Sequence, residues 1–286
     1  MSFLQIKSLF EMTKPRAMFV VLLTALAGVL LVSEGEPFSW LLLHLMIGTA
    51  LSGGGSIVLN QVIERDLDRQ MIRTCQRPMV TGVISPFVGW SYGAILSVVG
   101  TLWLWAFVNP ITALLAGLSV ASYAFIYTPL KRRTTLNTAV GAIPGAIPPM
   151  MGVTAVTGVI TPEAWVLFAI LFVWQFPHFL AIAWLHREDY ARAGYRMLPV
   201  LDVEGGMTAR QIVINTLCLL FLTMVPVMMH TAGHHYAIGA LAIGVVFLSL
   251  GLLHAYLRSV RSARILLRGS VIHIAVLMTL LVADRI

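Results

Sequence analysis

Residues 40–68 read WLLLHLMIGTALSGGGSIVLNQVIERDLD, a long apolar run that ends in a cluster of charges. A helix of about 20 apolar residues is long enough to cross the hydrocarbon core of a bilayer, which is about 30 Å thick. Residues 40–60 are therefore predicted to span a membrane. The small residues between Ser52 and Ser56 would let neighbouring helices approach this span closely.

The rest of the chain has the same character. Hydrophobic residues make up 58% of the 286 residues and charged residues only 11%, whereas about a quarter of the residues of a soluble domain are charged. We predict an all-α membrane helix bundle that forms a single domain over residues 1–286. The nine transmembrane helices are expected at about 17–33, 40–60, 86–107, 110–127, 136–157, 164–184, 211–229, 236–256 and 267–284.

Lysine and arginine residues gather in the loops on one side of this arrangement, and only Arg285 falls on the other side. Cytoplasmic loops are enriched in these residues, so we expect a multi-pass protein of the cell inner membrane with its N-terminus in the cytoplasm and its C-terminus outside. The insertion rule accounts for the net charge of +7 without a nucleic-acid partner. The last basic loop is expected to hold Arg258, Arg261, Arg264 and Arg268, and the opposite loops Glu34, Glu36, Glu163, His230, His234 and His235.

The charged segment after the second span has the spacing of a metal site. Asn60, Glu64 and Asp68 are four residues apart, so on a continuous helix they lie on one face. Carboxylate and amide oxygens suit Mg²⁺, which usually completes its shell from substrate phosphates. Arg73 and Arg77 follow with guanidinium groups that can hold phosphate oxygens. The alternative is a solvated helix end in which Arg65 pairs with Asp68.

Two other loops on the same side carry candidate residues. His178 and His186 are eight residues apart at the end of the sixth span, with Asp189 one turn further on. A zinc site is not favoured there, because nothing like the H-E-x-x-H motif is present. After the fourth span, Tyr127 precedes a basic triplet that begins with Lys131 and Arg132.

Three motifs occurring in this order make the sequence recognisable. They are NQVIERDLD with RTCQRP, then YTPLKRRTTLNT with GAIPGAIPP, and finally FPHF with REDYARAGY. The chain closely resembles the protohaem IX farnesyltransferases, a branch of the intramembrane aromatic prenyltransferase superfamily. The resemblance runs from about Lys14 to the C-terminus, although the final two helices contribute little to it.

The resemblance implies a nine-helix bundle around a central cavity open to the cytoplasm, in which acidic motifs bind Mg²⁺ and the prenyl diphosphate. The implied reaction transfers farnesyl from farnesyl diphosphate to a vinyl group of haem B with addition of water, giving haem O for haem-copper oxidases. Haem B is then a substrate, and haem-supplying or oxidase-assembly proteins are possible transient partners. The implied catalytic or metal-binding residues are Asn60, Glu64, Asp68, Lys131 and Asp189, and the implied substrate-binding residues are Arg73, Arg77, Tyr127, Arg132, His178, His186 and Arg187.

The second acidic motif departs from the superfamily pattern, because histidines and Asp189 occupy the region where two aspartates are usual. This departure resembles the haem branch and leaves open whether a second metal binds. Two alternatives have different functions. A prenyltransferase of the same architecture could act on a quinone or another aromatic precursor. A secondary transporter would also carry polar motifs, but its ionisable residues should lie near the middle of the bilayer rather than at one interface.

Overall fold

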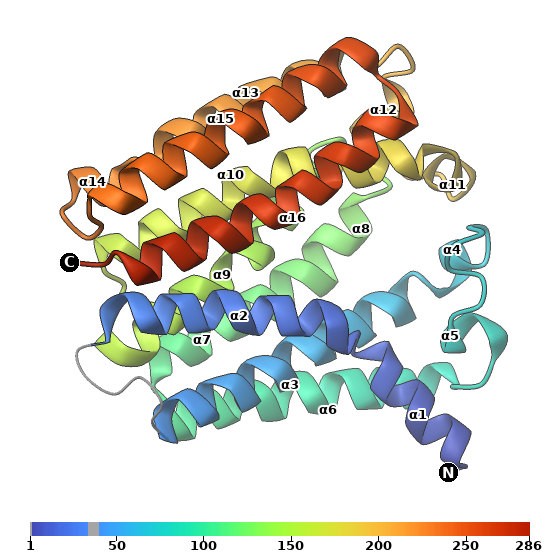
Figure 1. Cartoon of the computed structure of the whole chain (residues 1–286). Coiled ribbons are helices and arrows are strands. Elements are labelled where there is room, and N and C mark those ends of the chain that lie inside the picture. The colour runs from blue at the N-terminus through green and yellow to red at the C-terminus, as the bar shows by residue number, and fades with distance from the viewer. Residues whose placement is uncertain (1, 34–39) are drawn as a thin grey trace.

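The computed structural model describes residues 2–33 and 40–286, which form helices joined by short loops (Figure 1). In chain order the elements are α1 (Phe3–Met12), α2 (Pro15–Val32), α3 (Trp40–Ile63), α4 (Arg65–Asp68), α5 (Pro78–Thr81), α6 (Pro86–Phe107), α7 (Pro110–Ala121), the π-helix η1 (Ser122–Tyr127), α8 (Thr128–Leu130), α9 (Asn137–Thr157), α10 (Pro162–Leu185), α11 (Arg187–Arg192), α12 (Leu198–Leu201), α13 (Gly206–Leu222), α14 (Val225–Met228), α15 (His234–Leu257) and α16 (Val260–Ala283).

Nine helical stretches in the described part of the chain are long and apolar enough to cross a bilayer, which confirms the predicted number. Two of them are built from more than one element. The stretch from Pro110 to Leu130 joins α7, η1 and α8, and the stretch from Gly206 to Met228 joins α13 and α14. Because the number of crossings is odd, the two chain termini lie at opposite ends of the bundle (Figure 1). Which end faces the cytoplasm stays a prediction from the positions of the basic residues.

The last helix begins earlier than the sequence suggested. We expected it to start near residue 267, but α16 starts at Val260, so Arg261, Arg264 and Arg268 lie on the helix and not in a loop. Ser259 caps the helix by accepting a hydrogen bond from the backbone N–H of Ser262. The first turns of α16 are amphipathic, and a hydropathy window therefore misses them. The seventh span likewise begins at Gly206, before the expected residue 211.

Helix α9 lies between two groups of spans. It packs against α2 on one side and α10 on the other, and α10, α13, α15 and α16 form the upper group in Figure 1. At the crossing of α2 and α9, a Cβ atom on Gly152 would lie 2.0 Å from the carbonyl oxygen of Ala25, and one on Gly28 would lie 2.1 Å from that of Pro149. Only glycine permits this close approach of the two backbones.

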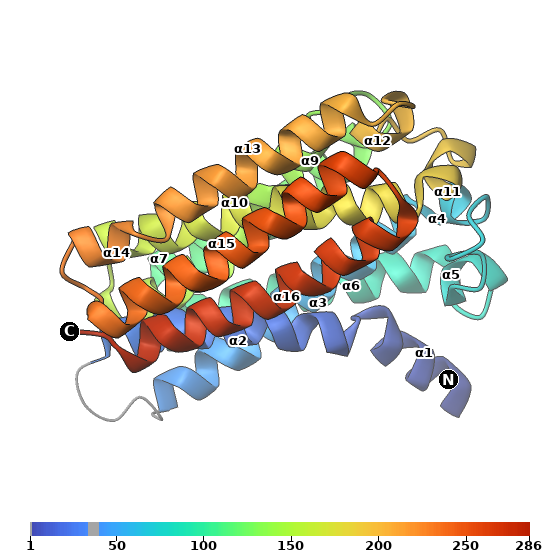
Figure 2. The ribbon, with the colours of Figure 1, turned by 45° about the horizontal axis from the view of Figure 1, so that its top comes forward.

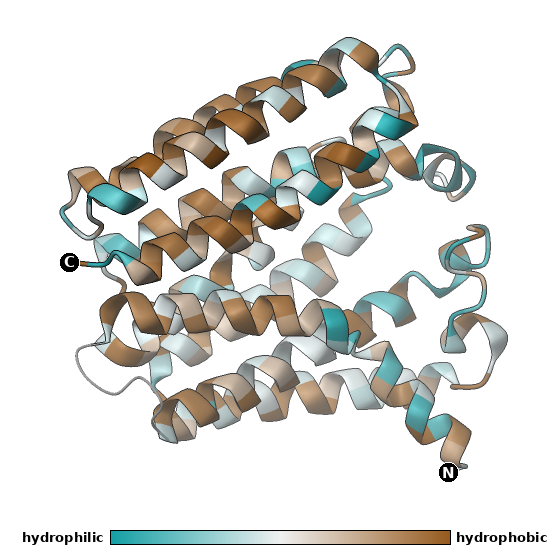
Figure 3. Cartoon of the chain, in the orientation of Figure 1, coloured by the Kyte–Doolittle hydropathy of each residue, from teal (hydrophilic) through white to brown (hydrophobic). Residues whose placement is uncertain are grey.

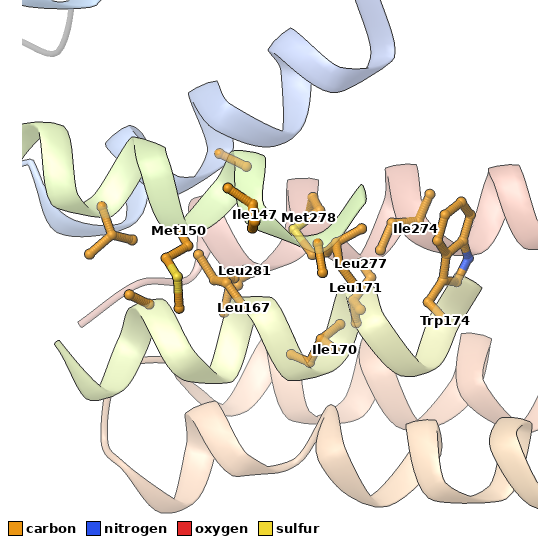
Figure 4. Packing of buried hydrophobic residues seen from close by; sticks show 14 of the residues in the cluster. Ile147, Met150, Leu167, Ile170, Leu171, Trp174, Ile274, Leu277, Met278 and Leu281 are labelled. Carbon is orange, nitrogen blue, oxygen red and sulfur yellow. The ribbon is translucent and has the colours of Figure 1, made fainter. Parts of the chain in front are cut away.

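The interior and exterior of the bundle are both apolar. Figure 4 shows the contact of α9, α10 and α16, where Ile170 and Leu277 are fully buried. Large apolar side chains such as Trp105 and Phe221 are exposed on the outside, where hydrophobic colouring runs along the spans (Figure 3). An apolar exterior is expected where a helix faces lipid rather than water.

Beyond the interior, two grooves of about 350 and 370 Å³ are present, between α9, α10 and α13 and between α1, α2, α3 and α6. No predicted site residue lines either groove.

The end of the bundle that holds the C-terminus also carries Glu163, His230, His234 and His235, as the predicted partition of the loops requires. Glu34 and Glu36, which we assigned to the same end, lie outside the described residues.

Candidate active site

Short segments from distant parts of the sequence meet at the other end of the bundle, which we call the charged end. Helices α4, α5, α11 and α12 lie together there in two views (Figures 1 and 2), and hydrophilic residues are concentrated there (Figure 3). The loop after α8 joins them, because the backbone N–H of Arg196 donates to the carbonyl oxygen of Lys131 at 2.7 Å. This end contains most of the predicted site residues.

Asn60, Glu64 and Asp68 are all buried, with exposed fractions of 2%, 4% and 0%. The helix is not continuous as we expected, since α3 ends at Ile63 and Glu64 separates it from α4. The spacing survives the break, because the N–H of Glu64 donates to the carbonyl of Asn60 at 2.9 Å and that of Asp68 to the carbonyl of Glu64 at 2.7 Å. The alternative of a solvated end with an Arg65–Asp68 pair is wrong, since Arg65 Nε donates to the carbonyl of Met79.

Each buried carboxylate has a cationic partner. Lys131 Nζ lies 2.7 Å from Glu64 Oε1, and Arg77 Nη1 lies 2.5 Å from Asp68 Oδ2. Burial raises the pKa of Asp68 although Arg77 opposes the shift. Burial alone would lower the pKa of Lys131, but the charge and hydrogen bond of Glu64 outweigh it and the pKa is raised. Lys131 is therefore a permanent cation at neutral pH.

Lys14 belongs to the same cluster, which the sequence did not reveal. It lies at the bend between α1 and α2 in a left-handed backbone conformation, with φ of 50°. Burial and the positive charges of Arg77, Lys131 and Arg73 together lower its pKa to about 8. The cluster thus holds four cations and two buried carboxylates, and such an excess of positive charge favours binding of an anion.

Two aromatic rings flank Lys131, that of Tyr127 in the π-helix at the end of the fourth span and that of Tyr195 in the loop between α11 and α12. The ammonium group of Lys131 lies 4.6 Å from the ring centre of Tyr127 and 5.7 Å from that of Tyr195, distances at which aromatic faces attract cations. Asn60 Nδ2 donates to Thr128 Oγ1 at 2.9 Å, which connects α3 to this segment. Tyr195 was not among the predicted site residues, although its hydroxyl is buried without a hydrogen-bond partner.

Asp189 fixes the backbone of the loop that carries the arginines. Its oxygens accept hydrogen bonds from the N–H groups of Ile72 and Arg73, at 3.2 and 3.3 Å, and it pairs with Arg192. Burial would raise its pKa, but the backbone N–H groups and Arg192 prevail and lower it. Asp189 was predicted to be a metal-binding residue with Asn60, Glu64 and Asp68, and this role stays a prediction. Among the described residues, no three His, Cys, Asp or Glu side chains are placed to hold an ion together.

The remaining predicted residues lie beside this cluster. His186 ends α10 and is partly exposed, and burial together with the charge of Arg73 lowers its pKa. Arg187 is exposed, with its guanidinium group 5.1 Å from the ring centre of Trp184. Arg132 is exposed, and its side chain forms no hydrogen bond or ion pair with another described residue. His178 lies earlier in α10 than His186, within the membrane-spanning part, where it contacts Ser270 of α16.

The acidic residues retain free acceptor atoms that fit a magnesium ion. Asp68 Oδ1 is buried without a hydrogen-bond partner, and an orphaned buried oxygen of this kind is costly unless something else satisfies it. Asn60 uses only its Nδ2 atom, and Glu64 pairs through Oε1 alone. An amide oxygen and two carboxylate oxygens are the ligand type that Mg²⁺ prefers.

Comparisons with known proteins identify the family to which the sequence is similar. Residues 21–274 match the model of the UbiA prenyltransferase family. A protohaem IX farnesyltransferase of Solibacter usitatus is 43% identical, over 96% of this chain and 97% of the relative. The protein of the same name from Koribacter versatilis is 40% identical, over 96% of this chain and 92% of the relative.

Solved structures show the same fold at lower sequence identity. A digeranylgeranylglyceryl phosphate synthase is 15% identical and superposes with a TM-score of 0.82 over 98% of both chains. A UbiA homologue from Archaeoglobus fulgidus bound to DMAPP and Mg²⁺ is 17% identical, with a TM-score of 0.70 over 96% of this chain and 98% of that one. At these identities the likeness establishes the fold alone.

Proposed function

Because this chain belongs to the UbiA prenyltransferase family, we propose that it transfers the farnesyl group of farnesyl diphosphate to a vinyl group of haem B, with addition of water, to give haem O and diphosphate. The observation that carries the diphosphate part of this proposal is the buried cluster of cations and carboxylates at the charged end. The acceptor is supported by the close similarity to the protohaem IX farnesyltransferases.

The residues of the charged end divide into two sets. Asn60, Glu64 and Asp68 would hold Mg²⁺, while Arg73, Arg77 and Lys131 would bind diphosphate oxygens, with Lys14 adding a further positive charge. When bound, the ion supplies positive charge that neutralises the departing diphosphate. Asp189 acts on this set indirectly, because it holds the backbone at Arg73.

Substrate binding would rearrange the two ion pairs. In the structure Lys131 and Arg77 neutralise the carboxylates that the metal ion would occupy. With the carboxylates engaged by Mg²⁺, Lys131 and Arg77 would be free to bind diphosphate oxygens, so each buried charge would still have a partner. Buried charges tolerate such an exchange only if each always keeps a partner.

The chemical step requires protection of the allylic cation from water more than it requires a strong base. The bond between C1 of the farnesyl group and the diphosphate oxygen breaks, and the electron pair leaves with diphosphate. The vinyl carbon then attacks C1, and water adds to the resulting cation and releases a proton. Water must not reach the allylic cation earlier. The faces of Tyr127 and Tyr195, which already flank a positive charge, would stabilise that cation.

We place the charged end on the cytoplasmic side of the cell inner membrane, as the distribution of Lys and Arg indicates. Haem B would enter beside His178 and His186, and Arg132 and Arg187 would meet its propionates or the diphosphate at the membrane surface. Contacts with haem-supplying or oxidase-assembly proteins would then be transient.

The test is formation of haem O by purified protein in lipid vesicles, measured by mass spectrometry after incubation with haem B, farnesyl diphosphate and Mg²⁺. Asp68→Asn should reduce the product at least a hundredfold, because it removes a buried ligand. Asp66→Asn is the matched control, since Asp66 is an exposed acid on the same short helix and should keep full activity. Equal activity of the two variants would reject the assignment of Asp68.

The acceptor is tested in the same vesicles by replacing haem B with a quinone precursor. The proposal requires a farnesylated haem and no farnesylated quinone precursor. The opposite result would assign the protein to the quinone branch of the family.

A further inference from the structure

The tautomer of His178 is fixed by its contact with Ser270. His178 Nδ1 lies 2.7 Å from Ser270 Oγ, and Ser270 Oγ lies 2.7 Å from the carbonyl oxygen of Leu267. Because a carbonyl oxygen only accepts, both contacts are satisfied at once only if the single hydroxyl hydrogen of Ser270 points to Leu267. Ser270 Oγ therefore accepts from His178, which places the proton on Nδ1 and a lone pair on Nε2.

The plane of the imidazole ring is fixed as well. The ring of Trp174 stacks on it with 4.7 Å between ring centres and 25° between planes. Trp174 Nε1 donates to the backbone carbonyl of Ser270 at 2.9 Å. Figure 4 shows Trp174 at this contact of α10 and α16, near Ile274. Ser270 itself is 0% exposed, so it anchors both rings from inside the bundle.

The opposite edge of the His178 ring is accessible. The side chain is partly exposed, Nε2 forms no hydrogen bond with another described residue, and it is not among the buried unpartnered atoms. A second pair shows the contrast. His254 Nδ1 lies 2.9 Å from Ser262 Oγ between α15 and α16, but the His254 side chain belongs to the buried interior, since the residue is only 1% exposed.

We propose that His178 Nε2 coordinates the iron of the haem substrate and that Ser270 is the positioning residue that presents it. The proposal rests on the proposed function, since it takes haem as the acceptor. Haem iron accepts a lone pair of neutral imidazole, and a metal-bound histidine usually donates its other ring N–H to an oxygen. Holding a propionate would instead require a hydrogen on Nε2, which this tautomer lacks. Coordination would fix the porphyrin relative to the charged end and so select the vinyl group that reaches C1.

The experiment is titration of ferrous haem B into the purified protein in nanodiscs without farnesyl diphosphate, followed by resonance Raman spectroscopy. Wild-type protein should show an iron–histidine stretching band. His178→Ala should lose the band and bind haem roughly ten- to hundredfold more weakly, and added imidazole should restore the band. Ser270→Ala should shift the band to lower frequency, because the ring loses the acceptor at Nδ1, and Ser270→Thr should reverse the shift.

Ser262→Ala is the matched control, since it removes the hydroxyl of the buried His254 pair and should change neither band nor affinity. Persistence of the band in His178→Ala without imidazole, or its absence from the wild-type protein, would overturn the proposal. A separate incubation with farnesyl diphosphate distinguishes the two claims. Haem O formed without an iron–histidine band rejects coordination alone, and a His178-dependent band without haem O rejects the transfer reaction alone.

Discussion

Replacing Lys131 with methionine tests the shorter of the two contacts between a lysine and a carboxylate among the described residues. Methionine keeps much of the length of the side chain and its contact with the ring of Tyr127, but it leaves Glu64 without the partner that lies 2.7 Å away. The side chains are only 10% and 5% exposed, so solvent cannot replace the lost charge. Removing one member of a buried pair costs about 3–5 kcal/mol, whereas neutralising both members is close to neutral. We therefore expect Lys131→Met to lower the free energy of unfolding by about 3–5 kcal/mol and Glu64→Gln to recover most of that loss.

The measurement is a double-mutant cycle on unfolding in mixed micelles of a mild detergent and dodecyl sulfate, followed by circular dichroism. Unfolding is preferred to turnover, because both single variants should be inactive. Lys7 and Glu11 provide a control cycle, since they are 3.9 Å apart with side chains 62% and 58% exposed, and such a pair contributes about 0.3–0.5 kcal/mol. A coupling energy below about 1 kcal/mol for Glu64 and Lys131 would refute the reasoning that their burial makes the pair strong.

Lys14→Arg should flatten the pH dependence of farnesyl diphosphate binding. Above the Lys14 pKa of about 8, the wild-type protein must take up a proton on Lys14 to bind, so its affinity falls about tenfold per pH unit. Since this pKa lies below the ordinary value, the charge of Lys14 destabilises the fold below pH 8 and the penalty is relieved as pH rises. Calorimetric titration at pH 7, 8 and 9 checks the slope, and equal slopes for both proteins would contradict it. Gly152→Ala should lower the free energy of unfolding by about 1–3 kcal/mol. Gly117→Ala should not destabilise the protein, because its Cβ would lie 3.7 Å from the nearest atom, and thermal melting of the two variants compares them. Asp189→Asn should weaken farnesyl diphosphate binding about tenfold, the usual loss when a supporting hydrogen bond to a charged group is removed, and should leave haem binding unchanged in parallel titrations.

Most of the fold is predictable because the bilayer imposes a strict requirement. Each crossing needs about 20 apolar residues, and the part of the chain that the structure describes meets this requirement nine times. The start of α16 was missed for a physical reason, since its first turns carry arginines on one face and Ala263 and Leu266 on the other. Average hydropathy does not detect such a helix end.

The site was predictable only where its residues are close in sequence. Asn60, Glu64 and Asp68 could be grouped by their spacing, and the structure shows them buried together. Their partners could not be assigned, because Lys131 and Lys14 reach the cluster through the packing of other helices. The partner of His178 could not be identified from the sequence either, since Ser270 lies 92 residues further along the chain.

The π-helical turn at Ser122–Tyr127 has a consequence for how the enzyme tolerates insertions and deletions. Such a turn corresponds to an α-helical turn with one residue added, and each residue of an α-helix accounts for about 100° of rotation. Losing Ala124 would restore an ordinary helix and turn Tyr127 and Lys131 by about that angle, away from Glu64. A single substitution leaves the length of this turn unchanged. A change in its length would turn Lys131 away from Glu64 even if every side chain of the site were kept.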